Sequence, residues 1–205
     1  MGSKMGKDLS KYDEKNVRPA DIEETEVRGT ADLRTERLLL RRYRPEDAED
    51  LYEYFGKDPA MSRYSGWNPY ATPDMAWETV ERFIGSYDDP HFYGWAIEYE
   101  NGLVGTVGAY EYKDDKIEVG LSVKRDCWGR GYAAEALKAA LEYLTKNEGI
   151  SCVTAWCAAD NIGSMKAMEK AGMRLVKTEK DGLAVGNRTY DKLSYEYRGK
   201  GGNKR

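Results

Sequence analysis

The sequence contains few of the residues that build metal sites and disulfide frameworks. Of its 205 residues one is histidine, His91, and three are cysteine, Cys127, Cys152 and Cys157, none of them in a C-x-x-C pair. A structural zinc ion takes four cysteine or histidine ligands, and a disulfide framework takes cysteines in pairs. We therefore predict neither kind of site and no bound metal.

Long apolar runs and a net positive charge are also missing. No stretch approaches the roughly 20 apolar residues that span a bilayer, and the N-terminal residues lack the apolar centre of a secretion signal. The formal charge is −4 and the isoelectric point is about 5.3, whereas nucleic acids and anionic membranes attract clustered lysine and arginine. We expect a cytoplasmic protein that binds neither of them.

The length and composition fit one domain with polar ends. The chain is 40% hydrophobic, which supports a single core of ordinary size. Residues 1–32 are rich in Lys, Asp and Glu and show no periodicity, so they are predicted to form a tail that is either disordered or ordered against a partner subunit, which leaves a homodimer open. The domain is predicted to cover residues 33–198, with a second flexible tail at 199–205.

The apolar pattern alternates between helix and strand periods along this domain. Strands are predicted at residues 38–40, 93–100, 103–112, 116–123, 152–158, 173–179 and 187–197. Helices are predicted from residue 45, at 73–85, at 133–146 and at 162–171, with Pro45 and Pro73 in first turns. Asn101 and Gly102 tolerate the positive φ angles of a tight hairpin, so the strands on either side of them are expected to be antiparallel.

A glycine-rich turn stands directly before the strongest helix. Gly129 and Gly131 flank Arg130, and the first backbone N–H groups of the following helix have no partner within the helix. Glycine lets a ligand approach those groups closely, and the helix dipole favours phosphate there. The alternative is a tight turn with a solvated arginine. The phosphate-binding P-loop and the dinucleotide-binding fingerprint are both excluded, because their glycine spacings are absent.

The strand before this turn, KIEVGLSV, is apolar on one side only. Ile117, Val119, Leu121 and Val123 alternate with Glu118, Gly120 and Ser122. A central strand covered by helices on both faces would be apolar throughout. The second face therefore either meets solvent or lines a cleft into which Glu118 points.

Four stretches taken together resemble the GNAT superfamily of acetyl-CoA-dependent N-acetyltransferases, and in particular the branch of the ribosomal-protein acetyltransferases RimJ and RimL. They are TERLLLRRYRPEDAEDL, IEVGLSV, WGRGYAAEAL and AADNIGSMKAMEKAGM, and the resemblance covers residues 33 to 197. It implies an α/β (α+β) fold with a mixed, mostly antiparallel central sheet of six to seven strands flanked by about four helices. It also implies acetyl-CoA as acyl donor and an amine as acceptor, foremost a protein N-terminus and next a small amine.

The resemblance implies where the coenzyme binds. The family's pyrophosphate motif falls on Trp128, Gly129, Arg130, Gly131, Tyr132 and Ala133. Trp128 departs from the usual Gln or Arg at the first position, which concerns a side-chain contact and not the main-chain N–H groups. The pantetheine arm is expected along the strand that ends with Leu121, Ser122 and Val123, where an N–H near Leu121 or Ser122 would polarise the thioester carbonyl.

The resemblance also implies the groups that handle protons. Glu118 matches the strand glutamate that acts as general base in some members, and Ser164 matches the serine near the coenzyme sulfur in the RimL-like branch. Asn161 matches the asparagine that binds pantetheine. From the residues alone, Asn161 is also a good helix N-cap and Ser164 an ordinary first-turn residue.

The acceptor side is predicted from aromatic residues between the first two helices and at a strand start. Tyr64, Trp67, Tyr70 and Tyr93 are expected to wall the acceptor pocket, although packing over the edge of the core would explain aromatic residues equally well. A second group of polar residues, all on the last strand, is expected to close the cleft: Arg188, Tyr190 and Asp191.

Two alternatives to direct acetyl transfer remain open. An acyl-enzyme on Cys127 activated by His91 lacks a third orienting group in the sequence, so direct transfer is preferred. A non-catalytic acyl-CoA-binding module would need the phosphate loop but not Glu118, Asn161 and Ser164 together, which favours the enzyme.

Overall fold

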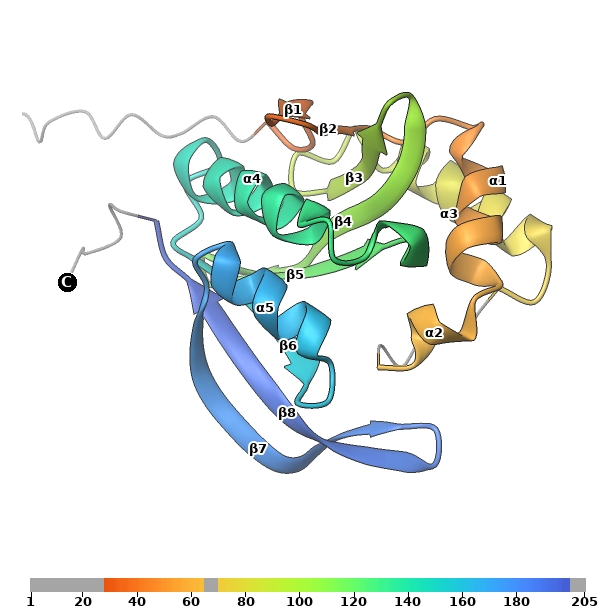
Figure 1. The fold of residues 1–205 in the computed structure, drawn as a ribbon. Helices are drawn as coiled ribbons and strands as arrows, with labels where there is room; N and C mark the ends of the chain where they lie inside the picture. Colours follow the sequence, from red (N-terminus) through yellow and green to blue (C-terminus); the bar gives the residue numbers. More distant parts are fainter. Residues whose placement is uncertain (1–27, 65–69, 200–205) are drawn as a thin grey trace, which may run out of the picture.

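A computed structural model describes residues 28–64 and 70–199 of the chain (Figure 1). The strands in these residues are β1 (Leu33–Arg34), β2 (Leu39–Arg41), β3 (Tyr93–Tyr99), β4 (Gly102–Lys113), β5 (Lys116–Val123), β6 (Cys152–Ala158), β7 (Arg174–Val185) and β8 (Arg188–Tyr197). The α-helices are α1 (Asp47–Leu51), α2 (Pro59–Ser62), α3 (Pro73–Gly85), α4 (Tyr132–Lys146) and α5 (Ile162–Lys170). A π-helical turn, η1 (Tyr52–Gly56), and a 3₁₀ turn, η2 (Arg125–Cys127), complete the list.

All eight strands belong to one mixed sheet in the order β1-β2-β3-β4-β5-β6-β8-β7. Only β5 and β6 pair in parallel, so the predicted mixed, mostly antiparallel sheet is confirmed. The described residues hold one strand and one helix more than expected. The two-residue strand β1 and the four-residue helix α2 are too short to show a period in the sequence.

The sheet separates two apolar clusters. In Figure 1, α4 and α5 lie side by side on one face, where the larger cluster includes Trp95, Val107 and Leu141. The smaller cluster joins α1, η1 and α3 to the sheet through residues such as Leu51 and Val80. The predicted antiparallel hairpin of β3 and β4 is present, but its turn lies one residue earlier than expected: Glu100 and Asn101 have positive φ angles, 49° and 65°, and Gly102 already begins β4.

Residues 28–32, which the sequence placed in the N-terminal tail, contact the folded domain. The backbone N–H groups of Arg28 and Gly29 donate to Oε2 of the buried Glu148, at 2.9 and 3.3 Å. The Tyr93 hydroxyl donates to the same oxygen at 2.9 Å, and the Tyr143 hydroxyl donates to the Gly29 carbonyl at 2.7 Å. None of the helices in residues 28–64 and 70–199 has both the length and the apolar character needed to traverse a membrane.

Candidate active site

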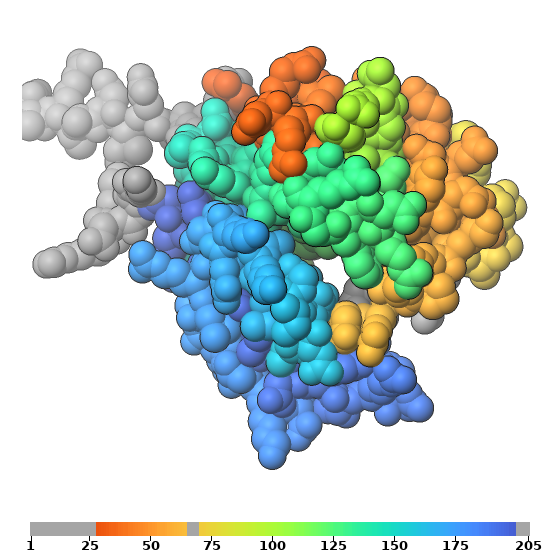
Figure 2. Space-filling view, viewed as in Figure 1, coloured from red at the N-terminus to blue at the C-terminus, as the bar shows by residue number. Residues whose placement is uncertain are grey.

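A cleft opens where β5 and β6 separate. The two strands pair only from Lys116↔Cys152 to Glu118↔Thr154, although β5 continues to Val123 and β6 to Ala158. The backbone of β5 beyond Glu118 is therefore not paired with β6 and faces a cavity of about 880 Å³. Figure 2 shows an opening of the surface between the green atoms at the start of α4, the orange atoms of α2 and the blue atoms around α5.

The glycine-rich turn at the mouth of this cleft presents unpaired N–H groups. Gly129 and Gly131 have φ angles of 76° and 84°, in the left-handed region that favours glycine. Gly131 is the N-cap of α4, no side chain caps this helix, and the first intrahelical bond runs from the Glu135 N–H to the Gly131 carbonyl at 3.1 Å. The N–H groups that precede Glu135 in the first turn of α4 are thus available to an anion, as in other phosphate-binding helix N-termini.

Trp128 anchors this turn to the sheet. Its indole Nε1 donates to the Val123 carbonyl at 2.6 Å, at the end of β5, while the side chain stays 53% exposed. The departure from the usual family residue at this position therefore has a structural use, because the indole holds the turn against the strand that precedes it.

Arg37, which the sequence analysis did not single out, braces the same turn. Its Nε and Nη2 both contact Glu135 Oε2, at 2.7 and 2.6 Å, its Nη1 donates to the Arg130 carbonyl at 3.0 Å, and the guanidinium lies 4.7 Å from the centroid of the Tyr132 ring. Burial acts to raise the pKa of Glu135, but hydrogen bonds from Thr35 and Arg37 outweigh it and hold this pKa below its ordinary value. The first turn of α4 is thereby fixed, and the carboxylate of Glu135 is neutralised near the proposed anion site.

We expect Arg37→Gln to raise the KM for acetyl-CoA about two- to fivefold, because a solvent-exposed ion pair of this kind stabilises the turn only modestly. kcat at saturating acetyl-CoA should change little. Steady-state kinetics with Arg34→Gln, another exposed arginine in the same segment, as control measures the effect. An unchanged KM would show that the turn keeps its shape without this contact.

Glu118 lies at the last paired position of the cleft and is held there by a tryptophan. The indole Nε1 of Trp156, on β6, donates to Glu118 Oε1 at 2.9 Å. On the other side, Tyr110 is the cross-strand neighbour of Glu118, and its ring covers Gly108 and Gly120, where any Cβ would meet it. Sequence reasoning missed both aromatic residues, because their partners lie on other strands.

Asn161 and Ser164 line the cavity from the start of α5. Asn161 is the N-cap of this helix, and its Oδ1 accepts from the Ser164 N–H at 3.2 Å. The capping interpretation is therefore correct. It occupies the oxygen of the Asn161 side chain and directs both side chains toward the cleft.

The structure brings most of the predicted site residues to one cavity. Those that line it are Tyr64, Tyr70, Tyr93, Glu118, Leu121, Ser122, Val123, Trp128, Gly129, Gly131, Tyr132, Ala133, Asn161 and Ser164. Arg130 is exposed and is not among the lining residues, and Trp67 lies outside the described residues.

The prediction that Tyr93 contacts the acceptor needs correction. Its side chain is 1% exposed and its hydroxyl is bonded to Glu148, so it is a core residue that only borders the cavity. Tyr93 has the aromatic character of a pocket wall, but its place on a central strand turns it inward.

Cys127 and His91 are not brought together. Cys127 is buried and lines the cavity, whereas His91 stacks on Tyr112 with ring centroids 5.1 Å apart and does not line it. Burial, with a smaller contribution from Glu169, raises the pKa of the other cavity cysteine, Cys157, to about 11, so that thiol is neutral at pH 7. The structure therefore places no histidine beside Cys127 in the cavity, and the Cys157 thiol is not activated.

Cys127→Ala should accordingly keep kcat/KM within about twofold of the unmodified enzyme, because no step of direct transfer uses the thiol. Thiol-release kinetics measures this, and unchanged thermal unfolding would confirm that the variant folds. A loss of more than a hundredfold with normal stability would instead support an acyl-enzyme.

A sheet that opens between two parallel strands, beside a glycine-rich helix N-terminus, defines a class of proteins that hold a phosphate-bearing coenzyme in extended form. The amino-acid sequence agrees with this class, because residues 37–174 match the protein-family model described as "Acetyltransferase (GNAT) domain". The chain belongs to the GNAT acetyltransferase family. It is an enzyme that transfers an acetyl group from acetyl-CoA to an amine.

Individual relatives support the same assignment. The Bacillus subtilis protein called "Uncharacterized N-acetyltransferase YnaD" is 29% identical over 164 residues, covering 80% of this chain and 94% of the relative. The crystal structure of a GNAT-family acetyltransferase from Bacillus anthracis superposes with a TM-score of 0.73 at 27% identity, covering 82% of this chain and 98% of that one. RimL, a ribosomal L7/L12 α-N-protein acetyltransferase in complex with coenzyme A, shares the fold with a TM-score of 0.75 at 16% identity, covering 82% and 98% of the two chains.

Proposed function

We propose that this enzyme acetylates the N-terminal amine of a protein or peptide in the cytoplasm, as a member of the RimJ/RimL-like branch. The observation that carries the proposal is the position of Glu118 at the point where β5 and β6 separate, within the same cavity as the glycine-rich turn. The acetyl group of acetyl-CoA and a carboxylate that can accept a proton would thus lie in the same cavity.

The reaction follows from this arrangement. N–H groups at Gly131, Tyr132 and Ala133 would hold the pyrophosphate, and the unpaired edge of β5 from Leu121 to Val123 would guide the pantetheine arm. An N–H near Leu121 or Ser122 would stabilise the oxyanion, an effect often worth about 3 kcal/mol.

The reaction needs two proton transfers, one from the acceptor amine and one to the thiolate of coenzyme A. As the acceptor nitrogen forms a bond to the acetyl carbon, Glu118 takes a proton from it, directly or through a water. The C–S bond then breaks, and the leaving thiolate takes a proton from the Ser164 hydroxyl or from water, while Asn161 would position the pantetheine. The proton held by Glu118 is released to solvent. Trp156 would fix the carboxylate that accepts the first proton.

Support for a peptide acceptor comes from the breadth of the cavity and from its aromatic wall. Tyr64 and Tyr70 line it as half-buried residues, and Tyr110 adds an exposed one. RimL, which shares the fold, is itself a protein N-acetyltransferase. The second candidate acceptor is a small amine, because a solved structure of similar fold is a spermidine N-acetyltransferase chimera with a TM-score of 0.67 at 19% identity.

A two-step experiment tests the proposal. Thermal-shift titration with acetyl-CoA, coenzyme A and NADH is expected to show stabilisation by the first two only, because NADH lacks the pantetheine arm. A thiol-release screen against short peptides with free and blocked N-termini, and against polyamines, should then give turnover with free N-termini. Stabilisation by coenzyme A without thiol release on any peptide or polyamine would overturn the proposed N-terminal acceptor.

A further inference from the structure

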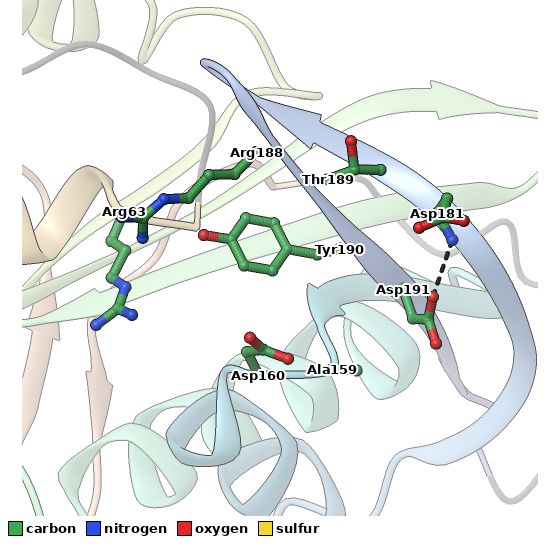
Figure 3. Close-up of a pocket in the computed structure, with 8 residues that line it drawn as sticks. All are labelled: Arg63, Ala159, Asp160, Asp181, Arg188, Thr189, Tyr190 and Asp191. Atoms are coloured by element: carbon green, nitrogen blue, oxygen red, sulfur yellow. Dashed lines mark hydrogen bonds between the residues drawn. The ribbon is translucent and has the colours of Figure 1, made fainter.

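A second pocket, of about 490 Å³, opens beside the cleft between α2 and the β7–β8 hairpin (Figure 3). Arg63 and Asp160 line both this pocket and the main cavity, so the two spaces are adjacent. A ligand whose amine reaches Glu118 could therefore extend into the second pocket.

Two arginines at one end of this pocket have no charge partner among residues 28–64 and 70–199. Arg63 is the C-cap of α2 and Arg188 is the first residue of β8, and both are exposed. Within the described ranges neither guanidinium forms an ion pair, although the Arg63 guanidinium lies 5.1 Å from the Tyr64 ring centroid. The planar donors of arginine match carboxylate and phosphate oxygens in pairs.

A buried hydroxyl lies at the same end. Tyr190 is 8% exposed, its ring packs edge-on against Tyr64 with centroids 5.4 Å apart, and in the described part of the chain its hydroxyl has no hydrogen-bond partner. Buried hydroxyls are normally bonded, so an unbonded one points to a missing partner. Figure 3 shows the Tyr190 hydroxyl directed toward the end of the pocket where Arg63 and Arg188 lie.

The pocket also holds three aspartates against its two arginines, so the positions of these acids decide where an anion can bind. Asp181 and Asp191 lie at the opposite end in Figure 3, where the Asp181 N–H donates to Asp191 Oδ1 at 2.9 Å. Asp160 borders both spaces and would repel an anion near the main cavity. An anionic group is therefore favoured only at the end that holds Arg63 and Arg188.

We propose that the acceptor carries an anionic group, a carboxylate or a phosphate a few bonds from its amine, and that Arg63 and Arg188 bind this group together with the Tyr190 hydroxyl. The inference rests on the proposed amine acetylation and narrows its substrate class. For a peptide acceptor it selects an acidic or phosphorylated side chain close to the N-terminus.

Matched peptides test this selection. Three peptides would differ only at the second residue, which is Asn, Asp or phosphoserine, and acetyl-CoA would be saturating. With the unmodified enzyme, one or both anionic peptides should have a kcat/KM about tenfold above the Asn peptide, and the stronger of the two identifies the group. The double variant Arg63→Gln/Arg188→Gln should lose this preference, so that the three peptides react with similar kcat/KM values, and it should keep the KM for acetyl-CoA. Tyr190→Phe should reduce the preference about two- to threefold.

Arg174→Gln, which removes an exposed arginine outside the pocket, is the control and should keep the full preference. Equal rates on all three peptides with the unmodified enzyme would overturn the inference and leave amine acetylation intact. A rise in the KM for acetyl-CoA in the double variant would also overturn it, because the arginines would then serve the coenzyme. Thiol release on no amine at all would overturn both proposals.

Discussion

Glu118→Gln is expected to lower kcat at pH 7 by roughly a hundred- to a thousandfold, because general-base catalysis contributes about 10²- to 10⁴-fold. The amide keeps the shape of the side chain and can still contact Trp156, but it cannot accept a proton. An N-terminal amine is largely protonated below about pH 8, so the loss should be largest at low pH and smaller at pH 9.5.

The measurement is a pH profile of kcat for both enzymes, with Glu81→Gln, an exposed glutamate on α3, as control. Trp156→Phe keeps an aromatic ring but removes the N–H that contacts Glu118. It should lower kcat by a smaller factor, about three- to tenfold, without a change in the KM for acetyl-CoA. A Glu118→Gln variant with the rate and profile of the unmodified enzyme would remove this residue from the mechanism.

Gly131→Val is expected to weaken coenzyme binding by roughly a hundredfold or more. Gly131 has φ 84°, a conformation that a β-branched residue adopts only at a cost of about 1–3 kcal/mol. The new side chain would also stand beside the Arg37 guanidinium, 3.5 Å from the position of its Cβ, and over the N–H groups that are proposed to hold the pyrophosphate. Calorimetric titration with coenzyme A measures the dissociation constant.

Gly186→Val provides the matched control, because Gly186 also has a positive φ angle, 60°, but has no atom within 4 Å of its Cβ position. Both variants should lose a similar amount of stability in thermal unfolding, while only Gly131→Val should lose affinity for coenzyme A. Equal affinities in the two variants would contradict the proposed phosphate site.

The parts of the fold that follow from local pattern were predicted well. Helix α4 begins within one residue of the predicted start and ends at Lys146 as expected. Its apolar residues recur at helical intervals, and Gly131 directly before them marks the start of the helix. The alternation in β5 predicted one unpacked face, and Glu118, Gly120 and Ser122 are only half-buried, whereas Ile117, Val119 and Val123 are buried. Very short elements such as α2 were missed, because four residues give no period.

The contacts that complete the site could not be predicted in the same way. Trp156 and Glu118 are 38 residues apart, and Arg37 and Glu135 are 98 residues apart. Such pairs depend on how strands are ordered in the sheet, which a single sequence does not encode locally. The assignment of Tyr93 to the acceptor pocket is wrong for the same reason. Its residue type suits a pocket wall, but its position on β3 puts it in the core.

The sequence by itself determined the elements whose cause is local: the helix that follows Gly131, the positive-φ turns and the one-sided apolar pattern of β5. Only the tertiary structure decided that β5 and β6 part after Glu118, that Trp156 and Arg37 reach the site, and that Arg63, Arg188 and Tyr190 share one pocket. The reason is that backbone conformation depends on neighbouring residues, whereas the meeting of distant side chains depends on the packing of the whole sheet.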